Sequence, residues 1–75
     1  MNLQSFVGKK VRLVDTNGNV LTGTADIYHH DYDTASGSAA LTFIADSGDY
    51  LDFDESEIKS IELAYASTQE LAVAV

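Results

Sequence analysis

The 75-residue sequence contains no cysteine and no proline, and only four of its residues are lysine or arginine. Without cysteine, the chain has neither a disulfide nor a thiolate ligand for a metal. It also lacks a run of the roughly 20 apolar residues that a membrane-spanning helix needs, and residues 1–10 lack the apolar centre of a signal peptide. We therefore expect a cytoplasmic protein that makes no contact with a membrane.

Acidic residues outnumber basic residues by 12 to 4, which gives a net charge of −8 and a pI near 4.2. A charge of this sign repels polyanions, because nucleic-acid binding depends on lysine and arginine displacing counterions. Nucleic acid is thus a disfavoured partner, although an acidic surface also keeps small proteins soluble. The hydrophobic content of 45% predicts one folded domain, which at this size buries only about 60% of its unfolded surface.

The N-terminal third of the chain has the pattern of a β-hairpin. Val11 and Leu13 alternate with basic residues, as in a strand with one buried face, and strand-forming residues resume after the turn. Asn17 and Gly18 lie between these segments and favour a hairpin turn, because both tolerate positive φ. Gly23 predicts a bend in the second strand. The two strands are expected over residues 9–15 and 20–30.

The remaining sequence alternates short apolar runs with turn-forming residues, which indicates three further strands. In chain order, the other expected elements are a helical turn over residues 2–7, a loop over 31–39, strands over 40–45, 50–53 and 58–63, and a 3₁₀ turn over 54–57. Residues 1–63 are thus predicted to form an all-β, five-stranded small barrel with a short N-terminal helical turn. The segment 64–75 is either a disordered tail or an edge strand.

Three motifs follow one another along this predicted barrel. They are Val7-Gly8-Lys9-Lys10-Val11-Arg12-Leu13, Leu21-Thr22-Gly23-Thr24-Ala25, and Phe53-Asp54-Glu55-Ser56-Glu57-Ile58-Lys59-Ser60-Ile61. Over residues 3–63 the chain resembles the Sm-like (LSM-type) family of SH3-type small barrels, and in particular its small acidic bacterial members. The resemblance implies rings in which the fourth strand of one subunit pairs with the fifth strand of the next. The edge residues for that contact would be Tyr50, Phe53, Ile58 and Ile61.

The residues of the family's RNA site are not kept. Its loop motif of aromatic-Asp-x-x-Met-Asn would fall on Tyr28, His29, Tyr32 and Asp33, so that histidine stands at the Asp position and aspartate at the Asn position. The phosphate-facing arginine of the closing motif would be Asp54. An aspartate in that place removes a charge-assisted bond and adds repulsion. The resemblance therefore implies the fold without the oligo-uridine site.

Two groups of residues are candidates for metal binding. Asp46, Asp49 and Asp52 have the oxygen ligands that suit Ca²⁺, although their spacing is not that of an EF-hand and solvated turn carboxylates explain them as well. His29 and His30 suit Zn²⁺, but neighbouring residues of a strand point to opposite faces. No cofactor is expected, and the three aspartates are the candidate cation site.

The sequence contains no constellation of nucleophile, base and pocket, so an enzyme is not expected. The expected function is that of a small cytoplasmic interaction or assembly module, which binds a protein partner or associates with itself. The alternative is RNA binding through a basic strip of Lys9, Lys10 and Arg12 on the first strand. Four tyrosines, Tyr28, Tyr32, Tyr50 and Tyr65, could stack on bases or on the apolar side chains of a partner; core or half-buried packing is the simpler interpretation of all four.

Overall fold

The computed structural model describes residues 1–64 of the chain. In chain order its elements are η1 (Leu3–Phe6), β1 (Lys10–Asp15), β2 (Val20–His29), η2 (Asp31–Asp33), β3 (Ala40–Ala45), β4 (Tyr50–Asp54), η3 (Glu55–Glu57) and β5 (Ile58–Leu63). The all-β prediction is confirmed, and β3 and β5 have the predicted bounds. The ends of the other three strands differ from the prediction by one residue, and the N-terminal turn is a single 3₁₀ helix.

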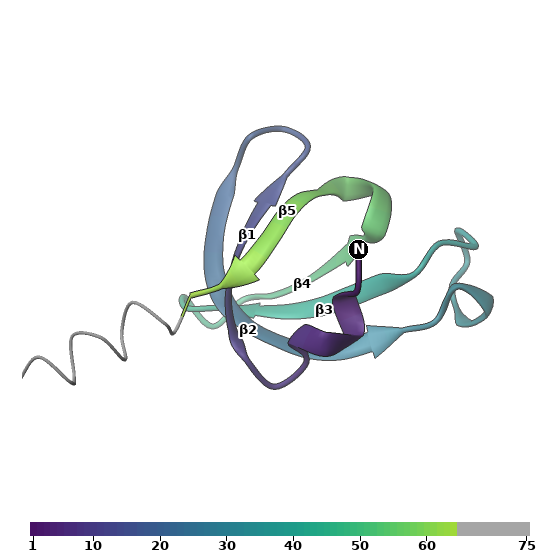
Figure 1. Ribbon diagram of the computed structural model, residues 1–75, viewed down its shortest axis with the longest axis horizontal. Coiled ribbons are helices and arrows are strands. Elements are labelled where there is room, and N and C mark those ends of the chain that lie inside the picture. Colours follow the sequence, from purple (N-terminus) through teal and green to yellow (C-terminus); the bar gives the residue numbers. More distant parts are fainter. Residues whose placement is uncertain (65–75) are drawn as a thin grey trace, which may run out of the picture.

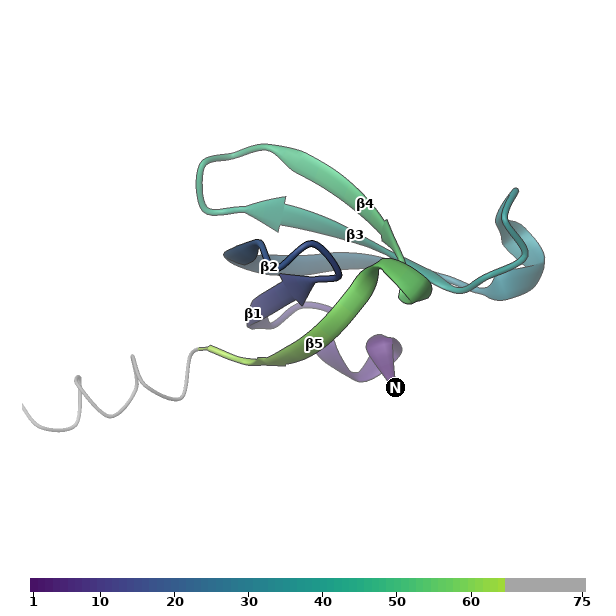
Figure 2. The ribbon, with the colours of Figure 1, turned by 90° about the horizontal axis from the view of Figure 1, so that it is seen from above.

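All five strands belong to one antiparallel sheet with the order β4-β3-β2-β1-β5. The sheet is strongly bent, so that β3 and β4 cross β1 and β5 at a steep angle (Figures 1 and 2). Within residues 1–64, β4 and β5 pair with β3 and β1 respectively, and not with each other. The sheet is therefore open, and closure into a barrel is not confirmed.

The core lies on the concave side of this bent sheet. Its side chains alternate along the inner strands, with Val11 and Leu13 on β1 and Leu41 and Phe43 on β3 all fully buried. Leu3 of η1 closes the core and is only 1% exposed. The segment that follows η1 is held to the sheet by the Gly8 amide, which donates a 2.7 Å hydrogen bond to the Ala25 carbonyl.

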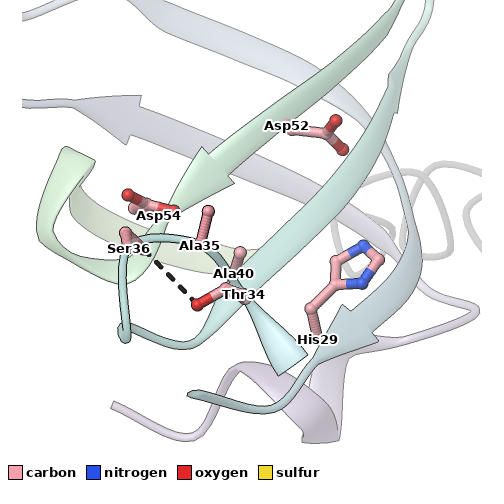
Figure 3. Close-up of a pocket in the computed structure, with 7 residues that line it drawn as sticks. All are labelled: His29, Thr34, Ala35, Ser36, Ala40, Asp52 and Asp54. Atoms are coloured by element: carbon pink, nitrogen blue, oxygen red, sulfur yellow. Dashed lines mark hydrogen bonds between the residues drawn. The ribbon is translucent and has the colours of Figure 1, made fainter. Parts of the chain in front are cut away.

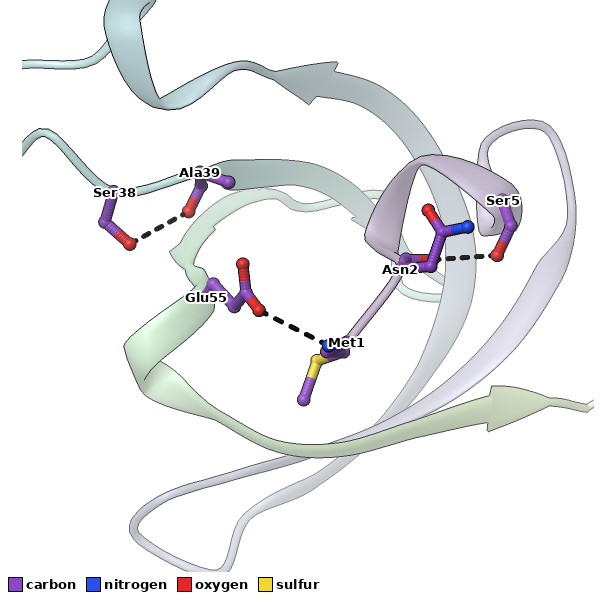
Figure 4. A network of polar contacts seen from close by, with 6 residues as sticks. All are labelled: Met1, Asn2, Ser5, Ser38, Ala39 and Glu55. Atoms are coloured by element: carbon purple, nitrogen blue, oxygen red, sulfur yellow. Dashed lines mark hydrogen bonds and ion pairs between the residues drawn. The ribbon is translucent and has the colours of Figure 1, made fainter.

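Polar contacts hold the N-terminal turn and the segment before β5 (Figure 4). The Ser5 hydroxyl donates to the Asn2 carbonyl at 2.7 Å, whereas the Asn2 side chain makes no capping bond. The Met1 amino nitrogen lies 3.8 Å from a carboxylate oxygen of Glu55 in η3. This ion pair joins the amino terminus, just before η1, to η3, the 3₁₀ turn that precedes β5.

Gly23 is the position at which β2 passes closest to its neighbour. It pairs with Val11 on one side and with Ala45 on the other, and a Cβ built on it would lie 2.2 Å from the Ile44 carbonyl oxygen. The sheet therefore has no room for any side chain here. The irregularity of β2 itself comes slightly later, where the register with β3 shifts between Ala25 and Ile27.

The turn between β1 and β2 is built around one carboxylate. Gly18 is the one residue of this turn with positive φ. Asn17 therefore does not adopt the left-handed conformation that an asparagine tolerates. The Asp15 carboxylate instead accepts hydrogen bonds from the Asn17 and Asn19 amides at 2.9 Å and from the Asn19 side chain at 3.0 Å. These bonds, the Asn19 side chain first, lower the pKa of Asp15 below its usual value.

Candidate functional site

The outer side of β4 presents unpaired backbone groups. The Ala45 amide donates to the Asp49 carbonyl and the Glu55 amide to the Ala39 carbonyl, both at 2.8 Å, and the register between these bonds is unbroken. In an antiparallel ladder, alternate residues bond to the same neighbour. Leu51 and Phe53 thus bond inward to β3, while the backbone groups of Tyr50 and Asp52 point away from the sheet.

The same reasoning defines the outer side of β5. The Ala64 amide donates to the Lys10 carbonyl at 3.0 Å, and the register of β5 with β1 continues from there through Ser60. Glu62 and Ser60 consequently bond inward, and the backbone groups of Ile61 and Leu63 point outward. Within residues 1–64, no strand pairs with the outer side of either β4 or β5. An unpaired edge of this kind can accept another strand.

The four predicted edge residues differ in how much side chain they expose. Tyr50 is 69% exposed, whereas Phe53 and Ile61 pack against the core and Ile58 is only 5% exposed. Phe53 also contacts Phe43 edge to face, with ring centroids 6.2 Å apart. Of these residues, Tyr50 offers a free side chain, and the others contribute chiefly by fixing the position of the strand edges.

The predicted basic strip is largely neutralised within the chain. Lys10 forms a hydrogen-bonded ion pair with Asp46, and Arg12 Nη1 lies 3.1 Å from a carboxylate oxygen of Glu62. Lys9 precedes β1 and is exposed. Two of the three cations that the RNA-binding alternative needs are thus already paired with acidic side chains, which does not favour that alternative.

The three aspartates of the candidate cation site are engaged separately. Asp46 bonds to Lys10 and to the Thr22 hydroxyl, and these two bonds lower the pKa of Asp46 below its usual value, the Lys10 bond most strongly. Asp49 accepts a bond from Ser47 at 2.9 Å, and Asp52 one from Thr42 at 2.6 Å. In the described part of the chain, no three histidine or carboxylate side chains are grouped closely enough to hold a metal ion.

A row of hydrogen-bonded polar side chains, which was not predicted from the sequence, crosses the outer face of β2, β3 and β4. His29 Nε2 lies 2.8 Å from the Thr42 hydroxyl, which donates to Asp52. Because a hydroxyl has one hydrogen, His29 must be the donor to Thr42. The strand register could have indicated this row, because it places Thr42 opposite Asp52. His30 points elsewhere and stacks on Tyr32, as expected for the neighbour of His29 on a strand.

Both end residues of this row, His29 and Asp52, border a pocket formed by β2, the segment after η2, β3 and β4 (Figure 3). The residues that line it are His29, Thr34, Ala35, Ser36, Ala40, Asp52 and Asp54. Its hydroxyl groups serve the local structure, because Thr34 donates to the Ser38 carbonyl at 2.7 Å and lies 3.4 Å from Ser36. The pocket therefore holds a histidine and carboxylates without an activated nucleophile, and we assign it no reaction.

A scan against protein-family models found no match, and neither a curated protein nor a solved structure was found to be similar to this chain. The resemblance to Sm-like proteins consequently stays a prediction from the sequence motifs. None of the helical turns in residues 1–64 has the length or the apolar character to cross a membrane. The predicted edge strand or tail at 64–75 lies, beyond Ala64, outside the described residues.

Proposed function

We propose that this protein is a small, non-enzymatic assembly module of the Sm-like barrel class. It binds a second copy of itself by adding β4 of one chain to β5 of another. The observation that carries the proposal is the pair of open sheet edges. Tyr50 and Asp52 direct backbone groups outward on β4, and Ile61 and Leu63 do so on β5. The strand order and the 3₁₀ turns before β1 and β5 support the barrel class.

The side chains at the two edges suit this pairing in part. Lys59 is the only basic residue on either β4 or β5, and its charge is opposite to that of Asp52 and Asp54 on the β4 of a second copy. The net charge of −8 on each chain opposes association. Salt screens this repulsion, so we expect the association of the full chain to strengthen as the ionic strength rises.

Native mass spectrometry of the untagged 75-residue chain tests the proposal. We expect masses that are multiples of the 8.1 kDa chain, in a fixed number set by the closing geometry. Tyr50→Lys places a charge on the open edge of β4 and should shift the equilibrium at least tenfold toward the monomer. The expected location is the cytoplasm, on the composition alone.

Val20→Lys is the matched control, since Val20 is also exposed, at 54%, but lies at the β1–β2 turn away from both free edges. This variant should assemble like the parent protein. A parent chain that stays monomeric at high concentration and salt, or equal weakening by both substitutions, would contradict the proposal. Retention of a different protein in place of a second copy would also contradict self-assembly.

A further inference from the structure

Three aromatic rings form a continuous stack at the end of β2. Tyr28 and His30 meet edge to face, with centroids 4.9 Å apart and planes at 87°. His30 and Tyr32 lie parallel, with centroids 5.0 Å apart and planes at 7°. Tyr28 packs against the core, so the stack rests on the folded domain at one end. Its other end is Tyr32, on η2.

Tyr32 presents an open ring face. Its side chain is 76% exposed, the highest value among the large hydrophobic residues of the described chain. Since His30 covers one face of the ring, the exposed area includes the opposite face. Figure 1 shows the segment that follows β2 projecting beyond the rest of the sheet, where a partner can reach it. Stacking on His30 fixes the ring before a ligand arrives, which lowers the entropic cost of binding.

The charge around this ring selects the ligand. Asp31 and Asp33 flank Tyr32, and both are exposed. From Asp31 to Glu57 the sequence has eight acidic residues and no lysine or arginine. A nucleotide would bring a phosphate into this negative field, and the carboxylates would repel it. A neutral apolar group would gain no electrostatic attraction from the carboxylates. A planar cation can stack on the ring and is also attracted by the carboxylates.

We infer that Tyr32 is the recognition site for an arginine side chain of a basic protein segment. The guanidinium is flat, stays charged, stacks on an aromatic face and donates to carboxylates in one arrangement. In this arrangement it lies on the open face of Tyr32, within the negative field of the exposed aspartates that flank this residue in the sequence. A lysine ammonium has the charge without the flat surface, so it binds less well. This site is separate from the strand edges and does not depend on self-assembly.

The test is a titration of the full chain with an N-acetylated, C-amidated peptide of alternating arginine and glycine, followed by NMR. We expect binding at low salt that weakens as salt is added, and an upfield shift of the arginine side-chain protons from the tyrosine ring current. Tyr32→Ala should weaken binding about fivefold and abolish that shift, while Tyr32→Phe, which keeps the ring, should retain both. Ile27→Ala removes another exposed side chain, 49% exposed, and should change neither.

Two comparison ligands make the inference falsifiable. The matching lysine–glycine peptide should bind more weakly than the arginine peptide. Equal binding of both peptides, unchanged in Tyr32→Ala, would mean that the acidic surface attracts cations without a site and would overturn the inference. Binding of an oligo-uridine that requires Tyr32, with no arginine-specific shift, would overturn it in favour of a nucleic-acid site.

Discussion

The three inner strands and the two outer strands of this sheet have different roles. β1, β2 and β3 are paired on both sides and supply most of the buried core, including Leu13, Leu41 and Phe43. β4 contributes no fully buried residue, and β5 contributes Ile58. Burial of apolar area drives folding, so the inner strands stabilise the domain. The outer strands keep half of their backbone groups available, which is what a strand-pairing module needs.

The largest expected effect lies at the centre of the sheet. Gly23→Ala places a methyl group within 2.2 Å of the Ile44 carbonyl oxygen and 2.8 Å of the Ala45 Cα. Both are backbone atoms, so the strands must move apart, and we expect a loss of about 3 kcal/mol or more in unfolding free energy. Gly37→Ala should cost only about 1 kcal/mol, because that position has positive φ but open space around it. Urea denaturation followed by circular dichroism measures both; equal losses would contradict the role of Gly23.

The same change of side chain should destabilise the domain more on an inner strand than on an outer strand. Leu41→Ala on β3 removes a fully buried side chain and should cost about 3 kcal/mol, whereas Leu51→Ala on β4 removes a half-buried one and should cost about 1 kcal/mol. Urea midpoints for dilute, monomeric protein give the two values. A cost for Leu51→Ala as large as that for Leu41→Ala would show that β4 belongs to the stabilising core.

Proline distinguishes the two sides of β4. The Leu51 amide bonds inward to β3, so Leu51→Pro removes a ladder bond and should cost about 3 kcal/mol. The Tyr50 amide points outward, so Tyr50→Pro should cost the monomer less than about 1 kcal/mol and still prevent assembly. Thermal unfolding and light scattering of the two variants check these outcomes. Loss of the monomer fold in Tyr50→Pro would mean that this amide has a partner within the chain.

The smallest effect concerns acid stability. Hydrogen bonds in the folded state lower the pKa of Asp15 and Asp46 below their usual value of 3.8. Their contribution is therefore complete above that value and is lost as the pH falls through the lower folded-state pKa. Asp46 is exposed and Asp15 is only half-buried, so the change is small. Asp46→Asn should lose less stability than the parent between pH 4 and pH 2; an identical pH profile would contradict the Lys10–Asp46 pairing.

Most of the strand positions could be predicted from the sequence, because alternating apolar residues and glycine-containing turns are local signals. The turn at Asp15 to Asn19 was expected, but its dependence on the Asp15 carboxylate was not. The pairing of Lys10 with Asp46 could not be found either, because it depends on which strands are neighbours. For the same reason the basic strip and the cation site were predicted as separate features, although Lys10 of the strip pairs with Asp46 of the cation site.

The aromatic stack shows a related limit. Tyr28 and His30 are two residues apart at the end of the predicted strand over 20–30, so their common face was predictable from strand geometry, whereas Tyr32 lies in the predicted loop. Their ring contacts depend on the chain turning into η2 directly after β2, which sequence periodicity did not predict. Residues 31–39 were expected to be a loop without regular structure. The 3₁₀ turn over Asp31–Asp33 brings Tyr32 back onto His30.

Amide hydrogen exchange of β4 shows whether the outer side of this strand pairs with a second copy. The Leu51 and Phe53 amides bond to β3 and should be protected at every protein concentration. The Tyr50 and Asp52 amides have no acceptor on the sheet, so we expect them to exchange freely in dilute protein and to become protected as concentration and salt increase. Exchange of Tyr50 and Asp52 that stays fast at every concentration, while the chain remains folded, would contradict pairing through this edge.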